Sequence, residues 1–158
     1  MTSQTGNGPA VAPNLDICTS TQQMELGTVV QGPAGKSYRY VKFLDAVAYV
    51  AGHVVTRASA TDWHVTNDRA GGSAIAGHEV VGVVFQSAAN VPTVGQFGWV
   101  QCGGLAAVAG TYAAGNQLIP HATVDGTAVI SAYSAADVSF NIFGNALSAS
   151  LVRLKGLN

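Results

Sequence analysis

The stretch FGWVQCGGLAAVAGTYAAGNQLIPHATVDGTAV, residues 97–129, decides the fold that we predict for this chain. Short apolar runs alternate in it with turn signals such as Gly-Gly, Ala-Gly and Asp-Gly, a pattern typical of consecutive β-strands. It contains no lysine, arginine or glutamate, and it overlaps a longer run, residues 80–124, that has no charged side chain at all. We therefore expect the surface that residues 80–124 form to be covered in part by other protein molecules rather than by water alone.

The composition limits the classes of partner. Charged residues make up 9% of the 158 residues, against about 25% in ordinary domains, and the mean hydropathy is +0.29. A net charge of -1 and scattered basic residues predict no binding to nucleic acid. Gly, Pro, Gln and Asn interrupt every apolar stretch before it could span a membrane, and the first residues lack a signal-peptide pattern. We expect one compact body that folds in a cytoplasm, with no membrane partner.

Outside residues 97–129 the same alternation of short strands and turns continues. No helical period of ten residues or more is convincing, and the Ala-rich segment 105–114 is expected to be strand or turn because glycines bracket it. Residues 67–77 and 86–95 have loop composition. The chain is therefore predicted to be all-β, a compact β-sandwich or barrel of short strands. The expected strands are 27–30, 37–43, 54–58, 63–66, 80–85, 97–102, 105–109, 117–119, 127–132, 139–143 and 151–157.

The N-terminal part differs from the rest. Residues 1–25 are polar, with two prolines that break helices, and we assign them as an extended arm ahead of a β domain at 26–158. Leu15 and Ile17 are its apolar anchors. Two interpretations remain open, a floppy terminus and an arm that becomes ordered against a neighbouring subunit.

The sequence suggests two related β modules, with an internal repeat at 48–104 and 111–158. Shifting the chain by 63 positions aligns residues 48–66 with 111–129, and the strand 80–84 falls near 142–146, one residue out of register. Composition bias in an Ala- and Gly-rich chain is the alternative explanation. The identical pairs are Tyr49 with Tyr112, Ala51 with Ala114, Gly52 with Gly115, and Asp62 with Asp125.

Candidate chemistry is sparse. Cys18 and Cys102 are expected to be reduced thiols, because two cysteines are too few for a stapled scaffold. His78-Glu79 lacks the second histidine of a zinc-protease helix, and neither a nucleophile elbow nor a phosphate-binding loop is present. We predict no catalytic, cofactor-binding or metal-binding residue, no cofactor and no enzymatic activity.

Several short motifs resemble those of a known class. They are Gly-Thr-Val-Val at 27–30, Tyr-Arg-Tyr-Val-Lys at 38–42, the Tyr-x-Ala-Gly turns, Gly-Asn-Ala-Leu at 144–147 and Leu-Val-Arg-Leu at 151–154. Together they resemble small virion proteins of tailed bacteriophages, in particular capsid decoration or cement proteins. The resemblance implies binding to the outside of an icosahedral head, often as a trimer, with the major capsid protein as partner and with no cofactor.

Two functions are weighed against each other. The first is a structural virion protein on the capsid surface, assembled in the host cytoplasm, that stabilises the shell through homo-oligomeric contacts with a trimer favoured. The second is a tail-associated or surface adhesin domain that binds glycans through Trp63 or Trp99. Candidate capsid or subunit contacts are Leu15, Ile17, Trp63, Trp99, Leu105 and Val108.

Overall fold

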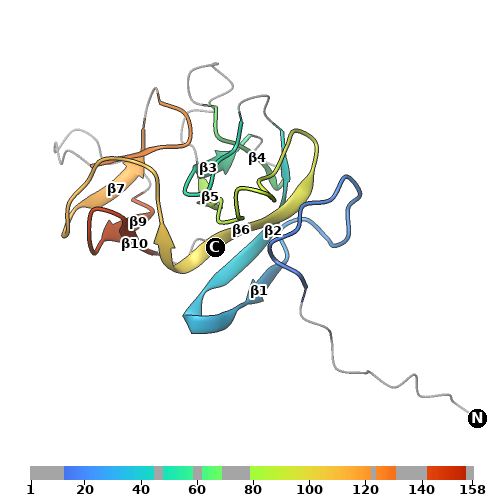
Figure 1. Ribbon diagram of the computed structural model, residues 1–158, viewed down its shortest axis with the longest axis horizontal. Coiled ribbons are helices and arrows are strands. Elements are labelled where there is room, and N and C mark those ends of the chain that lie inside the picture. Colours follow the sequence, from blue (N-terminus) through green and yellow to red (C-terminus); the bar gives the residue numbers. More distant parts are fainter. Residues whose placement is uncertain are drawn as a thin grey trace, which may run out of the picture.

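The structure, a computed structural model, describes residues 13–44, 48–58, 62–68, 79–121, 124–130 and 142–155 (Figure 1). Over these residues it is all-β, with one short 3-10 turn, η1, and no α-helix, as predicted. The elements are β1 (Val29–Gln31), η1 (Pro33–Gly35), β2 (Ser37–Phe43), β3 (Val54–Arg57), β4 (His64–Thr66), β5 (Val80–Val83), β6 (Phe97–Ala107), β7 (Gln117–Pro120), β8 (Ala128–Ile130), β9 (Gly144–Ala146) and β10 (Leu151–Leu154).

Five strands close into a barrel. The order β2-β4-β3-β5-β6 is completed by an antiparallel pairing of β6 with β2, and only the β2-β4 pairing in this ring is parallel. Alternate residues of these strands point inward and fill the barrel with aliphatic side chains, among them Val41, Val55 and Val100. Of the two predicted forms, sandwich or barrel, the barrel is the one that forms, with further strands outside it.

The longest strand, β6, corrects the expectation of two separate strands at 97–102 and 105–109. It runs without a break through Gly103 and Gly104, and in Figure 1 it crosses from the barrel to the strands beside it. A side chain at Gly103 would meet the Ser37 hydroxyl, and Gly104 has a φ of +82° next to the Gly35 carbonyl. The two glycines permit a close backbone approach rather than a turn.

The second half of β6 belongs to another five-stranded unit. It pairs with β10, and the order continues through β9 and β7 to β8. A parallel bridge between Gly110 and Ala128 then brings β8 back beside the chain that leaves β6. We call this ring the second unit and the closed ring the first barrel.

The two units have the same pattern of strand pairing. Arg57 lies opposite Val65 in the first barrel, and Pro120 lies opposite Ala128 in the second unit, both at an offset of 63 residues. The parallel contact of β2 with β4 likewise matches the parallel bridge in the second unit. The internal repeat and its limits stay a prediction, and this correspondence of registers supports it.

The buried positions correspond as well. Seven buried positions in the core of the first barrel match seven in the core that includes the second unit. One of these matched pairs is a buried tyrosine in each unit. The matched pairs are Val41 and Val108, Tyr49 and Tyr112, Val55 and Leu118, Val65 and Ala128, Val81 and Phe143, Val84 and Ala146, and Val100 and Val152.

One kind of turn starts several strands. In each case a glycine with positive φ stands third in a four-residue turn, and the amide of the fourth residue donates to the carbonyl of the first. Because only glycine adopts this φ without strain, the turns are readable in the sequence. They are Glu25–Thr28 before β1, Val50–His53 before β3, Thr93–Gln96 before β6, Ala113–Asn116 before β7 and Val124–Thr127 before β8.

Other sequence predictions have mixed outcomes. The strand expected at 80–85 is confirmed for residues 80–83, which form β5 and are all buried. The segment 105–114 is strand or turn, as expected, rather than helix. The strand expected at 139–143 is wrong at its described end, because β9 starts at Gly144, and residues 139–141 lie outside the described residues. Most of the 67–77 loop also lies outside them.

Candidate functional site

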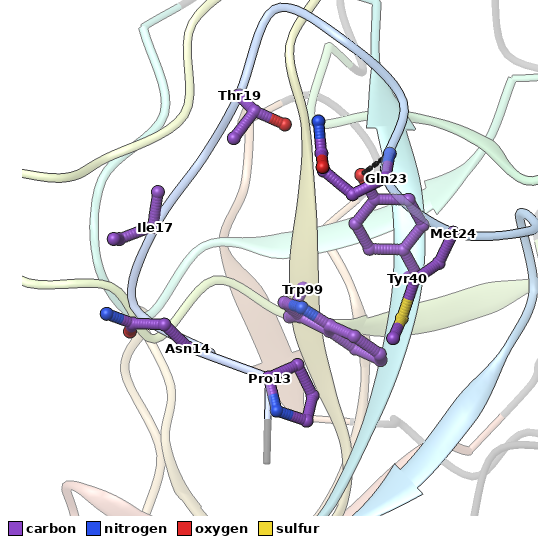
Figure 2. Close-up of a pocket in the computed structure, with 8 residues that line it drawn as sticks. All are labelled: Pro13, Asn14, Ile17, Thr19, Gln23, Met24, Tyr40 and Trp99. Atoms are coloured by element: carbon purple, nitrogen blue, oxygen red, sulfur yellow. Dashed lines mark hydrogen bonds between the residues drawn. The ribbon is translucent and has the colours of Figure 1, made fainter. Parts of the chain in front are cut away.

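A groove lies between the N-terminal segment, residues 13–24, and the outer face of β2 and β6 (Figure 2). Its volume is about 390 Å³. Figure 2 shows the segment looping around the Tyr40 and Trp99 rings, which form the floor. The lining residues are Pro13, Asn14, Ile17, Thr19, Gln23, Met24, Tyr40 and Trp99.

Hydrogen bonds hold the N-terminal segment on the barrel of its own chain. The Asp16 carboxylate accepts from the Ser87 amide at 3.0 Å and from Asn90 Nδ2 at 2.7 Å, and these bonds hold its pKa below the usual value. Thr19 and Phe97 exchange two backbone hydrogen bonds of 2.9 and 2.8 Å. The described part of the predicted arm is therefore packed against its own barrel.

The floor of the groove is built by a cross-strand aromatic pair. Tyr40 on β2 lies opposite Trp99 on β6, with ring centroids 5.1 Å apart and a tilt of 58°. The Tyr40 hydroxyl accepts a hydrogen bond from the Gln23 amide at 3.0 Å, the dashed line in Figure 2. Trp99 is only 3% exposed, so the groove offers an apolar floor with amide groups at its edge rather than an open stacking platform.

Four exposed apolar side chains lie on the N-terminal segment and on the chain segments that follow β2 and precede β6. Ile17 is 47% exposed and Met24 also projects into solvent at the groove. Leu44 and Val94 are exposed on two chain segments that are joined by the bond from the Gly95 amide to the Phe43 carbonyl. We call Ile17, Met24, Leu44 and Val94 the arm-end surface. It can bury aliphatic area against a protein partner.

The six predicted contact residues do not form one site. Ile17 and Trp99 line the groove together, and Leu15 packs beside it on the cluster of Tyr38, Tyr40 and Trp99. Leu105 is 37% exposed on β6, whereas Val108 is 7% exposed within the core. Trp99 and Val108 are buried within the chain, and the role of all six residues as contacts stays a prediction.

Trp63 lies in a different place, between two arginines. The guanidinium carbons of Arg39 and Arg57 lie 4.1 and 3.7 Å from its ring centroid. The Nε1 edge of the indole packs against Gly27, where a Cβ atom would clash with it. The ring is therefore covered by the chain itself, and this placement does not provide a free face for a sugar.

Six of the eight groove residues were not among the predicted contacts. Tyr40, Met24 and Pro13 join Trp99 and Ile17 only through the β2-β6 pairing and the path of the N-terminal segment. The alternation of residues 37–43 places Tyr38 and Tyr40 on one face of a strand. This pattern is the feature of the sequence that could have indicated Tyr40 as a groove residue.

Metal ligands and thiols are the other groups to consider in the described ranges. No group of three or more His, Cys, Asp or Glu side chains there could hold a metal ion. Cys18 and Cys102 are free thiols in the structure, and burial raises the pKa of Cys18 to about 11. No helix in the described part of the chain has the length and hydropathy needed to cross a membrane.

Comparison with known proteins gave no match, whether the chain was compared with protein families, with curated sequences or with solved structures.

Proposed function

We propose that this chain is a structural virion protein that binds the outer surface of a bacteriophage capsid and stabilises the shell. Its partners are the major capsid protein and further copies of itself, with a trimer favoured. The observation that carries the proposal is the arm-end surface, four exposed apolar side chains of which Val94 belongs to the charge-free run. The sequence motifs given above support the same class.

The energetic argument depends on many copies. Burying apolar surface stabilises a contact by about 25 cal/mol per Å², so each copy needs only a modest area of contact. Contacts repeated over a shell add up, because each copy is attached to a lattice that holds its neighbours in place. Aliphatic side chains suit this role, since their burial requires the desolvation of no charge of their own.

The test uses capsids assembled without this chain, from the virus that encodes it. Purified protein is expected to bind them and to raise their disruption temperature. The double variant Ile17→Glu/Val94→Glu is expected to stay folded and to lose binding, because it places two carboxylates in the contact. Leu147→Glu, which charges an exposed leucine beyond β9, is the matched control and is expected to bind normally. Absence of binding by the unmodified protein would contradict the proposal.

Glycan binding is the second candidate, favoured by the groove alone, which combines the Trp99 and Tyr40 rings with the Asn14 and Gln23 amides. Saturable binding on a glycan array, lost in Asn14→Ala, would favour it. Trp99→Ala is a poor test because the side chain is buried and its loss would disturb the fold.

A further inference from the structure

One end of the first barrel carries charge, unlike its aliphatic interior. Arg39 is two residues before Val41 on β2, and Arg57 is two residues after Val55 on β3, so both side chains point to the inside of the barrel at its end. Trp63 and Glu79 occupy the corresponding places before β4 and β5. We call these four residues the barrel mouth.

The side chains of the mouth follow the order of the strands. Since β4 lies between β2 and β3, Arg39 and Arg57 reach Trp63 from opposite sides, and their guanidinium groups cover both faces of the indole. Glu79 lies on the far side of Arg57, with its Oε2 3.1 Å from Arg57 Nε. Glu79, the one carboxylate among these four residues, therefore forms an ion pair with Arg57.

Among the described residues, no carboxylate forms an ion pair with Arg39. It is 5% exposed, its Nε is buried without a hydrogen-bond partner, and no hydrogen bond or ion pair joins its guanidinium to another described residue. Burial lowers its pKa, the electrostatic effects of Cys102 and Glu79 raise it, and the nearby Arg57 lowers it further. A buried cation without a paired anion is unfavourable, and such groups in proteins normally hold a counter-charge.

The described residues of the second unit that match the barrel mouth carry no charge. The pairing registers match Arg39 with Ala106, Arg57 with Pro120 and Trp63 with Gly126. The shared architecture therefore does not require charge at this end of a barrel, because the second unit forms the same pairings without it.

We propose that the barrel mouth is an anion site, in which Arg39 binds a monoanionic carboxylate. The planar guanidinium matches the two oxygens of a carboxylate and forms short charge-assisted hydrogen bonds with them. Glu79 is nearby and disfavours a dianion such as phosphate more than a monoanion. Because Arg39 is only 5% exposed, we expect nothing larger than a small molecule or the tip of one acidic side chain to reach it. Either source supplies the same chemistry, and the inference does not depend on the capsid proposal.

The first experiment uses acetate as the probe on the full chain. Acetate is titrated against sodium chloride at matched ionic strength, and the Arg39 Nε–Hε signal and the melting temperature are followed. A saturable shift of that signal and a rise in melting temperature with acetate are expected. Absence of a saturable shift overturns the proposal, as does tighter binding of inorganic phosphate than of acetate.

Variants separate the site from general salt effects. Arg39→Lys keeps the charge but removes the planar fork, and it is expected to bind acetate roughly tenfold more weakly. Arg39→Met is expected to lose the acetate effect entirely. Arg153→Met, on the exposed side of β10, is the matched control and should respond as the unmodified protein does. An equal response to acetate in Arg39→Met would overturn the assignment of the site.

Native mass spectrometry of the protein as purified distinguishes the two sources of carboxylate. A retained mass of a small organic acid, absent in Arg39→Met, identifies a free carboxylate as the ligand. If the purified protein binds acetate but carries no such mass, its site is free to bind an acidic side chain of a partner protein. Acetate binding that survives in Arg39→Met contradicts both.

Discussion

The first barrel and the second unit use the same strand pairings and the same buried positions, yet they differ in what they add to this frame. The first barrel carries the N-terminal segment, the groove and the barrel mouth, whereas the second unit has Ala106, Pro120 and Gly126 at the positions of the mouth. Positions that match between the units serve folding, and those that differ are the ones to examine for function.

The largest expected effect separates a matched core position from its exposed neighbour. Val108→Glu places an unpaired carboxylate in the core, at the position that corresponds to Val41, and should cost about 3–5 kcal/mol, most of the stability of a typical domain. Leu105→Glu should change stability by about 0.5 kcal/mol or less, because Leu105 is exposed and lies opposite Arg153. Denaturant unfolding measures both. Equal losses in the two variants would show that the burial of Val108 is misjudged.

The next effect concerns a matched pair of crowded glycines. A Cβ at Gly82 would lie 2.7 Å from the Gln101 carbonyl oxygen, and one at Gly144 would lie 2.6 Å from Val152 Cγ1. Gly82→Ala and Gly144→Ala should each destabilise the fold by about 1–3 kcal/mol. Gly35→Ala, where the space is open, should cost about 1 kcal/mol through its φ of +69° alone. If only one of the two crowded sites responds, the packing of the two units differs there.

A smaller effect is expected at the matched tyrosines. The Tyr49 hydroxyl donates to the Val65 carbonyl at 3.2 Å, and the Tyr112 hydroxyl donates to the Val108 carbonyl at 2.7 Å. Tyr49→Phe and Tyr112→Phe should each lower the free energy of unfolding by about 1 kcal/mol, since each leaves a buried carbonyl with one bond fewer. Thermal or denaturant unfolding of the two variants side by side gives the comparison. A neutral result in both would mean that the hydroxyls are solvated instead.

The smallest effect depends on pH and lies where the units meet. Burial lowers the pKa of His53 below its usual 6.5, partly offset by Asp125, and its ring contacts Asn67 Nδ2 at 3.0 Å. Because the folded pKa is below the unfolded one, protonation favours unfolding, and stability should fall as pH drops through 6.5 toward the folded pKa.

His53→Asn introduces the residue found at the matched position of the second unit, Asn116, and removes this titration. The pH dependence of unfolding between neutral and mildly acidic pH should be smaller in the variant. An unchanged pH profile would assign the dependence to other groups.

Much of the fold could be predicted from the sequence because its turns are local. A glycine third in a four-residue turn and apolar alternation after it mark the starts of β3 and β7. Continuity of β6 could not be predicted, since Gly103-Gly104 reads as a turn unless the close approach of Ser37 is known. Sequence patterns describe local geometry, and the pairing of distant strands decides the rest.

The candidate sites were harder to predict for the same reason. Ile17 and Trp99 were predicted as contacts, but the groove that they share depends on the path of residues 13–24 over the barrel. The stack on Trp63 depends on the order β2-β4-β3-β5, in which neighbours in space are not neighbours in sequence. Neither arrangement has a local pattern that could reveal it.

An image of capsids carrying this protein, at a resolution that resolves one copy, tests the central claim most directly. We expect copies attached to the outer surface, with the arm-end surface around Ile17 and Val94 in contact with the shell or with a neighbouring copy. Capsids without added density, or copies whose arm-end surface faces solvent on every side, would contradict it.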